Sequence, residues 1–120
     1  MYRCFLGAKL HRFVITEADL DYVGSITLDR DLLELSGILP GERVQVAGLG
    51  SGARFETYVM EGPSGSGTVC INGAAALLIE IGERVIVLQY QWIDPDSEKI
   101  PEPRVVMADD NNLNPRLLSS

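Results

Sequence analysis

The sequence predicts one mainly β domain, closed into a small six-stranded barrel with short helices and an extended C-terminal tail. Six segments rich in β-branched and aromatic residues are separated by polar or glycine-rich turns, whereas only two short stretches have helical character. A strand-opening motif also occurs twice, which indicates a duplicated unit and hence a closed, symmetric sheet. We place the barrel in residues 1–93 and the tail in residues 94–120.

The first two strands are expected in "CFLGAKLHRFVIT" (4–16) and "YVGSITL" (22–28), with the polar connection "EADLDY" between them. Successive side chains of a strand point to opposite faces, so Lys9 and His11 share one face of the first strand. A short helix follows over 29–37, because Asp29 can cap its start and Gly37 can end it.

The second half of the barrel contains four more strands and one short helical turn. The strands are "ERVQVAGL" (42–49), its hairpin partner "RFETYVM" (54–60), "TVCIN" (68–72) and "ERVIVLQYQWI" (83–93), and the helical turn is "GAAALLI" (73–79). After Ile93, three prolines among charged residues predict an extended surface segment, and the last stretch, "DDNNLNPRLLSS", is expected to be mobile.

The repeated motif is Gly-Glu-Arg-Val-x-Val, found in "LPGERVQV" (39–46) and "EIGERVIV" (80–87). Each copy follows a short helical segment and opens a strand. Gly-Glu-Arg is also ordinary turn chemistry, but the matching context favours a duplicated strand–helix–strand unit with pseudo-two-fold symmetry.

Composition narrows the classes of function. The net charge of −7 argues against a nucleic-acid-binding surface, which needs a basic patch. The N-terminus lacks the apolar core of a signal peptide, and no apolar run is long enough to span a membrane. We therefore expect a cytoplasmic protein in which Cys4 and Cys70 are reduced, partly buried thiols.

The step Gly24-Ser25 lies in the middle of the second expected strand, where glycine weakens β structure. Taken alone, this step predicts a β-bulge. A hydrolase built from Ser25, His11 and either Asp19 or Asp21 is a weak alternative, because Ser25 is not in a GxSxG motif. The single histidine and the absence of GxxxxGK[ST] exclude two-histidine metal sites and a P-loop, and we expect no metal.

Four motifs occur in a fixed order: "GAKLHR", "YVGSITLD", "GARFETY" and "VCINGAAA". Together they resemble the pyruvoyl-dependent aspartate 1-decarboxylases, which convert L-aspartate to β-alanine and CO2 for pantothenate and coenzyme A synthesis. The resemblance covers about residues 1–90 and implies a double-psi β-barrel fold and a homotetramer. A non-enzymatic double-psi barrel that binds or assembles without cleaving itself is the alternative.

The resemblance implies that the chain is a precursor that cleaves itself between Gly24 and Ser25. The Ser25 hydroxyl would attack the Gly24 carbonyl, and Thr57 would stabilise the tetrahedral intermediate. Elimination and hydrolysis would then turn Ser25 into a covalent pyruvoyl group, which forms a Schiff base with the substrate amine and accepts electrons as CO2 leaves. Tyr58 would return a proton to the α-carbon.

Substrate binding is implied for a further set of residues. Arg54 and Lys9 would bind the two carboxylates of aspartate, the first by a bidentate fork and the second as a point charge. Thr57, Gly73, Ala74 and Ala75 match the other substrate-contacting positions. His11, Tyr22 and Asn72 would have supporting roles.

The chain departs from the family pattern at two positions. Ala47 stands where members of the family carry a tryptophan, which implies a wider pocket or one filled by Leu49. Ala8 replaces a common glycine. Neither change removes a group that the chemistry needs.

Overall fold

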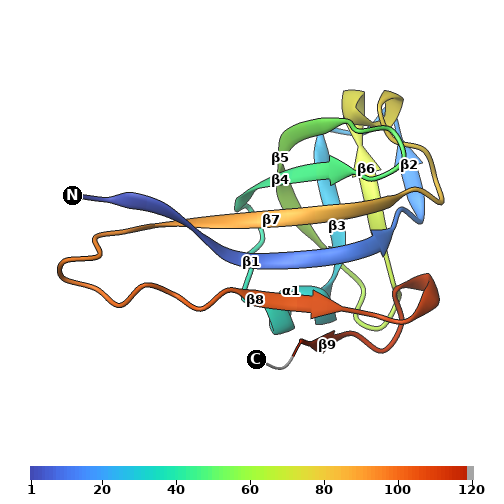
Figure 1. Ribbon diagram of the computed structural model, residues 1–120. Coiled ribbons are helices and arrows are strands. Elements are labelled where there is room, and N and C mark those ends of the chain that lie inside the picture. The colour runs from blue at the N-terminus through green and yellow to red at the C-terminus, as the bar shows by residue number, and fades with distance from the viewer. Residues whose placement is uncertain (119–120) are drawn as a thin grey trace.

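The computed structural model describes residues 1–118 and is mainly β, as the sequence predicts (Figure 1). It contains one α-helix, two short 3-10 helices and nine strands among these residues. The elements in chain order are β1 (Arg3–Val14), β2 (Glu17–Asp19), β3 (Ser25–Asp29), α1 (Arg30–Ser36), β4 (Arg43–Gly48), β5 (Arg54–Gly62), β6 (Val69–Asn72), η1 (Gly73–Leu77), β7 (Arg84–Ile93), β8 (Arg104–Met107), η2 (Asp110–Asn112) and β9 (Arg116–Leu117).

The strands pair in the order β2-β6-β3-β5-β4-β7-β1-β8-β9. The closed six-stranded barrel expected from the sequence is not confirmed, because this order begins at β2 and ends at β9. The difference in number comes from three short strands. One of them, β2, lies in the expected polar connection, and β8 and β9 lie in the expected tail.

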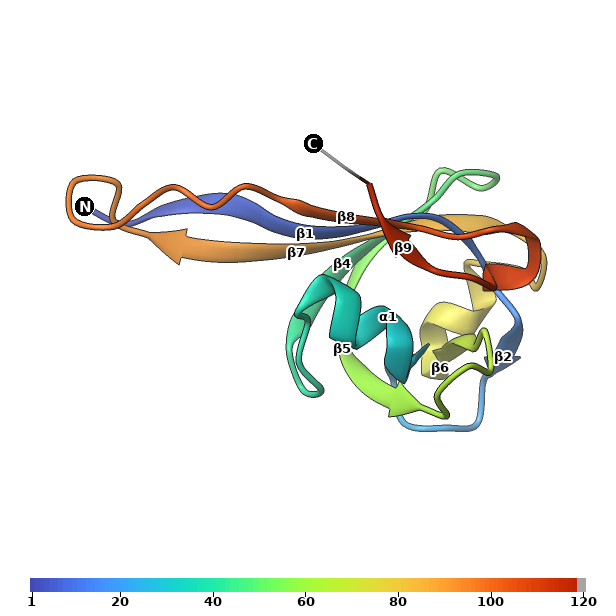
Figure 2. The ribbon, with the colours of Figure 1, turned by 90° about the horizontal axis from the view of Figure 1, so that it is seen from below.

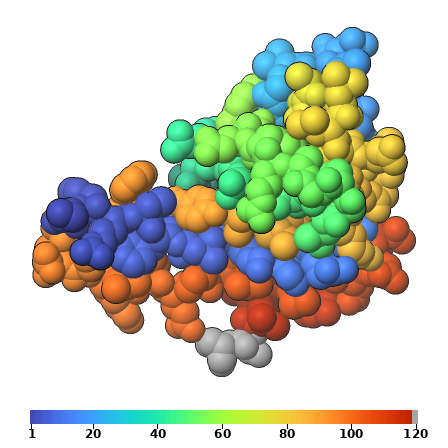
Figure 3. All heavy atoms as spheres, turned by 45° about the horizontal axis from the view of Figure 1, so that its top comes forward, coloured from blue at the N-terminus to red at the C-terminus, as the bar shows by residue number. Residues whose placement is uncertain are grey.

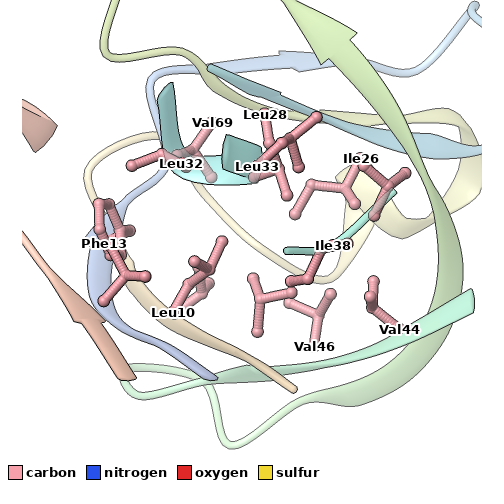
Figure 4. Packing of buried hydrophobic residues seen from close by; sticks show 14 of the residues in the cluster. Leu10, Phe13, Ile26, Leu28, Leu32, Leu33, Ile38, Val44, Val46 and Val69 are labelled. Carbon is pink, nitrogen blue, oxygen red and sulfur yellow. The ribbon is translucent and has the colours of Figure 1, made fainter. Parts of the chain in front are cut away.

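The core contains side chains from the inward face of almost every strand and from α1 (Figure 4). Leu10, Val46 and Val87 come from three neighbouring strands and are each 0% exposed. Because a fully buried aliphatic side chain contributes about 1.5–3 kcal/mol, this alternation determines which face of each strand points inward. The polar residues at the intervening positions are therefore held on the outer face.

The ends of α1 agree with the prediction. The Asp31 backbone N–H donates to Asp29 Oδ1 at 2.8 Å, and Gly37 adopts a left-handed conformation with φ 77°. The buried Asp29 carboxylate also accepts the N–H groups of Gly65 and Gly67, at 3.1 and 2.8 Å. One carboxylate thus caps the helix and holds the loop between β5 and β6.

The two copies of the repeated motif pair with each other. β4 and β7 are antiparallel, and Val46 lies opposite Val87, the residue at the equivalent position of the other copy. β3 and β6, which precede the two helical segments, are also antiparallel partners. Both pairings are those expected of a duplicated strand–helix–strand unit related by a two-fold axis.

The C-terminal segment has order that the sequence did not indicate. β8 pairs in parallel with β1, and β9 pairs with β8. Asn112 is only 2% exposed; its side chain accepts from Val14 N and donates to the carbonyls of Val14 and Gly67. In Figure 2 the far ends of β1 and β7 project with the connection to β8 as an arm.

Within the described residues, no helix has the length and apolar character needed to cross a membrane.

Candidate active site

Ser25 is the first residue of β3 and is 1% exposed, whereas Gly24 directly before it is exposed. β3 lies between β5 and β6, and Ser25 faces Asn72 in the antiparallel pairing with β6. The predicted second strand therefore begins at Ser25 and not at Tyr22. The Gly24-Ser25 bond lies at the junction between an exposed loop and a buried strand.

The Ser25 hydroxyl has three polar neighbours. It lies 3.2 Å from the Val23 carbonyl and 3.2 Å from Met60 Sδ, which compete for its single proton. It accepts a hydrogen bond from Asn72 Nδ2 at 3.0 Å. A serine oxygen held by a donor in a buried setting is oriented, and negative charge that develops on it is stabilised.

Asn72 is the centre of this arrangement and is 5% exposed. Its Nδ2 also donates to Thr27 Oγ1 at 3.0 Å, and its Oδ1 accepts from the Cys70 thiol at 3.3 Å. Ser25 and Thr27, and likewise Cys70 and Asn72, are two residues apart on paired strands, so all four side chains share one face of the sheet.

Gly73, which opens η1, packs against the Gly24 backbone. Its φ is 78°, and a Cβ atom at this position would lie 2.6 Å from Gly24 Cα. Only glycine satisfies both conditions. Gly24 itself is open on its outer side, since a Cβ there would meet nothing within 4 Å. Figure 3 shows the segment before β3, in light blue, gathered with η1, in yellow, at one end of the molecule.

A pocket of about 430 Å³ adjoins this cluster. Its lining includes Tyr22, Thr27, Met60, Cys70 and Asn72, together with the acidic residues Glu17, Asp19 and Glu61. Burial, and then the charges of Glu17 and Asp19, raise the pKa of the Cys70 thiol. Cys70 is therefore a neutral hydrogen-bond donor, and its thiol is not poised as a nucleophile.

The predicted cations lie elsewhere, on the outer face of the β1-β7-β4-β5 sheet. Across these strands His11 pairs with Ile86, Ile86 with Ala47 and Ala47 with Arg54. Lys9 lies on the same face, two residues before His11, and pairs with Leu88 of β7. Within residues 1–118 neither Lys9 nor Arg54 forms an ion pair, although the chain is acidic. Both charges are thus available to an anion.

His11 lies beside Lys9 on this face. Burial, and then the charges of Lys9 and Arg12, lower the pKa of the His11 imidazole, so its neutral form is favoured. Its Nδ1 is buried without a hydrogen-bond partner among the described residues. Among residues 1–118 His11 makes no hydrogen bond to Ser25, so the contact that the Ser25–His11 hydrolase alternative requires is not formed within the described chain.

Thr57 and Tyr58 lie on β5, next to the strand that Ser25 opens. Thr57 is half-buried opposite Val44, and Tyr58 is 39% exposed opposite Arg43. Within residues 1–118 neither hydroxyl is hydrogen-bonded to Gly24 or Ser25. In η1, Ala74 is exposed and Ala75 is half-buried. The structure thus unites Ser25 with Asn72 and Gly73, and keeps Lys9, His11 and Arg54 apart from them.

The sequence did not indicate three residues of this cluster: Met60, which contacts Ser25, and Thr27 and Cys70, which contact Asn72. Thr27 and Cys70 had a signal, because each lies two residues from a predicted site residue on the same strand. Met60 had none, because it reaches Ser25 only through the parallel pairing of β3 with β5.

Comparison with known proteins gives a consistent result. The family model described as aspartate decarboxylase matches residues 1–114. The aspartate 1-decarboxylase of Thermoanaerobacter pseudethanolicus is 48% identical over 112 residues, which cover 93% of this chain and 96% of the relative. The Bacillus subtilis enzyme of the same name is 44% identical over 120 residues, covering 100% and 94% of the two chains. That of Neisseria meningitidis is 50% identical over 112 residues, covering 93% and 88%.

Proposed function

The chain belongs to the aspartate decarboxylase family and decarboxylates L-aspartate, and on that premise we propose that it matures by cleaving itself between Gly24 and Ser25. The observation that carries this proposal is the hydrogen bond from Asn72 Nδ2 to the buried Ser25 Oγ, directly beside the open face of Gly24. Ser25 is the residue from which the pyruvoyl group would form.

The proposed cleavage begins with an acyl shift that turns the Gly24-Ser25 amide into an ester, and the chain separates only later, when the Ser25 Cβ–Oγ bond breaks. In the acyl shift, a new bond forms between Ser25 Oγ and the Gly24 carbonyl carbon. The bond from that carbon to the Ser25 nitrogen breaks, and the nitrogen takes up the hydroxyl proton. Asn72 Nδ2 is positioned to stabilise charge on Oγ during the attack. Ile26 pairs with Val59, and the parallel register continued two residues back brings Thr57 level with Gly24. This supports Thr57 as the donor to the Gly24 oxyanion.

The residues near Ser25 fit the group that would form there. Gly73 leaves room for the backbone directly before Ser25. When present, a pyruvoyl carbonyl supplies an electrophile for the substrate amine and an acceptor for the electrons left as CO2 departs. Tyr58, which is 39% exposed, is proposed to deliver the proton that replaces CO2.

Aspartate brings two carboxylates, and we assign them to Arg54 and Lys9, with Thr57, Gly73, Ala74 and Ala75 as further contacts. In one chain these two cations lie on the outer sheet face and do not line the pocket beside Ser25. This separation supports the homotetramer, because a second copy can bring its Lys9 and Arg54 to the Ser25 end. Tyr22 and Val23, 48% and 68% exposed beside the cleavage bond, are apolar enough to be covered in such an assembly.

We also propose that the sheet closes as a six-stranded double-psi barrel, with β1 and β2 acting as one bent strand. Only Ile15 and Thr16 separate them, and their N–H groups donate to Glu83 O and Val69 O, both at 2.9 Å. β1 pairs with β7, and β2 with β6. β5 has the same double role in the other half, since it pairs with β4 and then with β3.

Intact-mass measurement of the purified protein under denaturing conditions tests the cleavage. We expect fragments of residues 1–24 and 25–120, the second blocked at its N-terminus by a carbonyl. Ser25→Ala should remain intact and inactive. The matched control, Ser97→Ala in an exposed loop, should cleave normally. A wild-type chain that decarboxylates aspartate while remaining intact would overturn the proposal.

We also propose that the enzyme acts in the cytoplasm. Both of its cysteines are free, and its substrate is a small metabolite, and both properties fit that compartment.

A further inference from the structure

We propose that Cys70 is a positioning residue for the self-cleavage and acts through Asn72. Its thiol donates to Asn72 Oδ1 at 3.3 Å and so holds the opposite end of the amide, Nδ2, against Ser25 Oγ. The inference rests on the proposed function, because it concerns the rate at which the Gly24-Ser25 bond is cleaved.

The Asn72 amide has two orientations, related by exchange of its oxygen and nitrogen. The hydroxyls of Ser25 and Thr27 tolerate both, since a hydroxyl can donate or accept. The Cys70 thiol discriminates between them, because a neutral thiol is a hydrogen-bond donor whose sulfur is only a weak acceptor. Cys70 is 6% exposed, and burial keeps it protonated by raising the pKa of the thiol. The observed orientation is therefore the one that a donor at position 70 selects.

The orientation matters for the chemistry at Ser25. With Nδ2 against Oγ, the amide donates to an oxygen that becomes more negative as its proton leaves and it attacks the Gly24 carbon. The same donor stabilises that oxygen later, when the Ser25 Cβ–Oγ bond breaks, the Ser25 α-proton is lost and Oγ departs as part of the Gly24 carboxylate. With the amide reversed, a carbonyl oxygen would face Oγ and oppose both changes.

Strand pairing on both sides fixes the backbone at Cys70. It pairs with Thr27 on β3 and with Glu17 on β2, so β6 is fixed from both sides at this residue. Asn72 is likewise paired with Ser25 and Asp19. The Cys70 sulfur also lies 4.0 Å from the Ile71 carbonyl oxygen, so the shorter contact, 3.3 Å to Asn72 Oδ1, is the one through which Cys70 acts on Ser25.

The test compares Cys70→Ser, which keeps a donor of similar size, with Cys70→Ala, which removes it. The precursor is followed by intact mass at fixed temperature, and Cys4→Ala, at an exposed position, is the control. We expect Cys70→Ser to cleave within about threefold of the wild-type rate and Cys70→Ala to be slower by about tenfold, as for the loss of one buried hydrogen bond. Cys4→Ala should cleave as the wild type does.

Stability is measured separately, in a Ser25→Ala background where no variant can cleave. Equal rates for Cys70→Ala and the wild type would overturn the inference, and so would equal slowing by Cys70→Ser and Cys70→Ala. A wild-type chain that never cleaves would instead overturn the proposed self-cleavage itself. The two failures are thus distinguishable.

Discussion

Asn72 Nδ2 donates to Ser25 Oγ at 3.0 Å, although the two residues are 47 positions apart in the sequence. Both side chains are buried, and the pairing of β3 with β6 sets their distance. The geometry of the proposed cleavage site therefore depends on a strand register. Substitutions around this site are expected to change the cleavage rate, the binding of aspartate or the stability of the fold, and each of these can be measured separately.

Asn72→Ala removes the donor to Ser25 Oγ and leaves the Cys70 thiol without its acceptor. We expect cleavage to slow by at least about tenfold, because a buried donor that stabilises developing charge contributes about 2–4 kcal/mol at its largest. Intact-mass time courses measure this rate. A variant with unchanged melting temperature and unchanged cleavage rate would contradict the role of Asn72.

Gly73→Ala should displace the Gly24 backbone, since its Cβ would lie 2.6 Å from Gly24 Cα. Gly52→Ala is a matched control, because Gly52 has a similar φ of 75° but open space around its Cβ position. Both changes carry the cost of a left-handed residue, about 1–2 kcal/mol. Only Gly73→Ala should also impair cleavage, as read by mass spectrometry. Equal cleavage in the two variants would argue against the Gly73–Gly24 contact.

Arg54→Ala and Ser25→Ala test the shared site. Each variant alone should have little or no decarboxylase activity, the first through a raised KM for aspartate. If the site combines residues of two chains, co-expression of the two variants should restore activity in mixed assemblies, which a coupled assay of β-alanine detects. Absence of any restoration, with mixed assemblies confirmed by native mass spectrometry, would place Arg54 and Ser25 in sites formed within one chain.

Asn112→Ala tests the order of the C-terminal segment. It removes three hydrogen bonds made by a buried side chain, with Val14 N, Val14 O and Gly67 O. Because backbone groups left unsatisfied in a buried place are costly, we expect the free energy of unfolding to fall by about 2–3 kcal/mol. Urea denaturation measures it. Asn114→Ala, at an exposed position, should have a smaller effect.

The stability of the folded chain is expected to depend on pH through the Glu83 carboxyl group. Burial alone would raise the pKa of its carboxyl, but hydrogen bonds from Ser51, Glu80 and Gly50 outweigh burial and lower it. The ionised form is thus favoured by folding, so its contribution is present above the ordinary value of 4.5 and is lost as the pH falls through the lower folded value. The difference in melting temperature between the wild type and Glu83→Gln should shrink from pH 7 to about pH 3. A constant difference would contradict this assignment.

Local sequence patterns were enough to predict most of the strands and the helix α1. Period-two alternation located most strands, and Asp29 and Gly37 marked the ends of α1, because caps and alternation are properties of a few adjacent residues. The same reasoning failed for β8 and β9. These short strands have little pattern of their own and are ordered by β1 and by the buried Asn112.

By itself, the sequence determined the family, the Gly24-Ser25 step and the repeat whose copies meet at Val46 and Val87. These features follow from the order of residues along the chain, so they can be recognised without knowing any tertiary contact. Only the tertiary structure decided that Asn72 and Met60 contact Ser25 and that Thr27 and Cys70 contact Asn72. It also decided that Lys9 and Arg54 lie on another face of the sheet. The physical reason is that contacts between distant residues depend on strand register and on which face of the sheet is buried, and the whole chain sets both together.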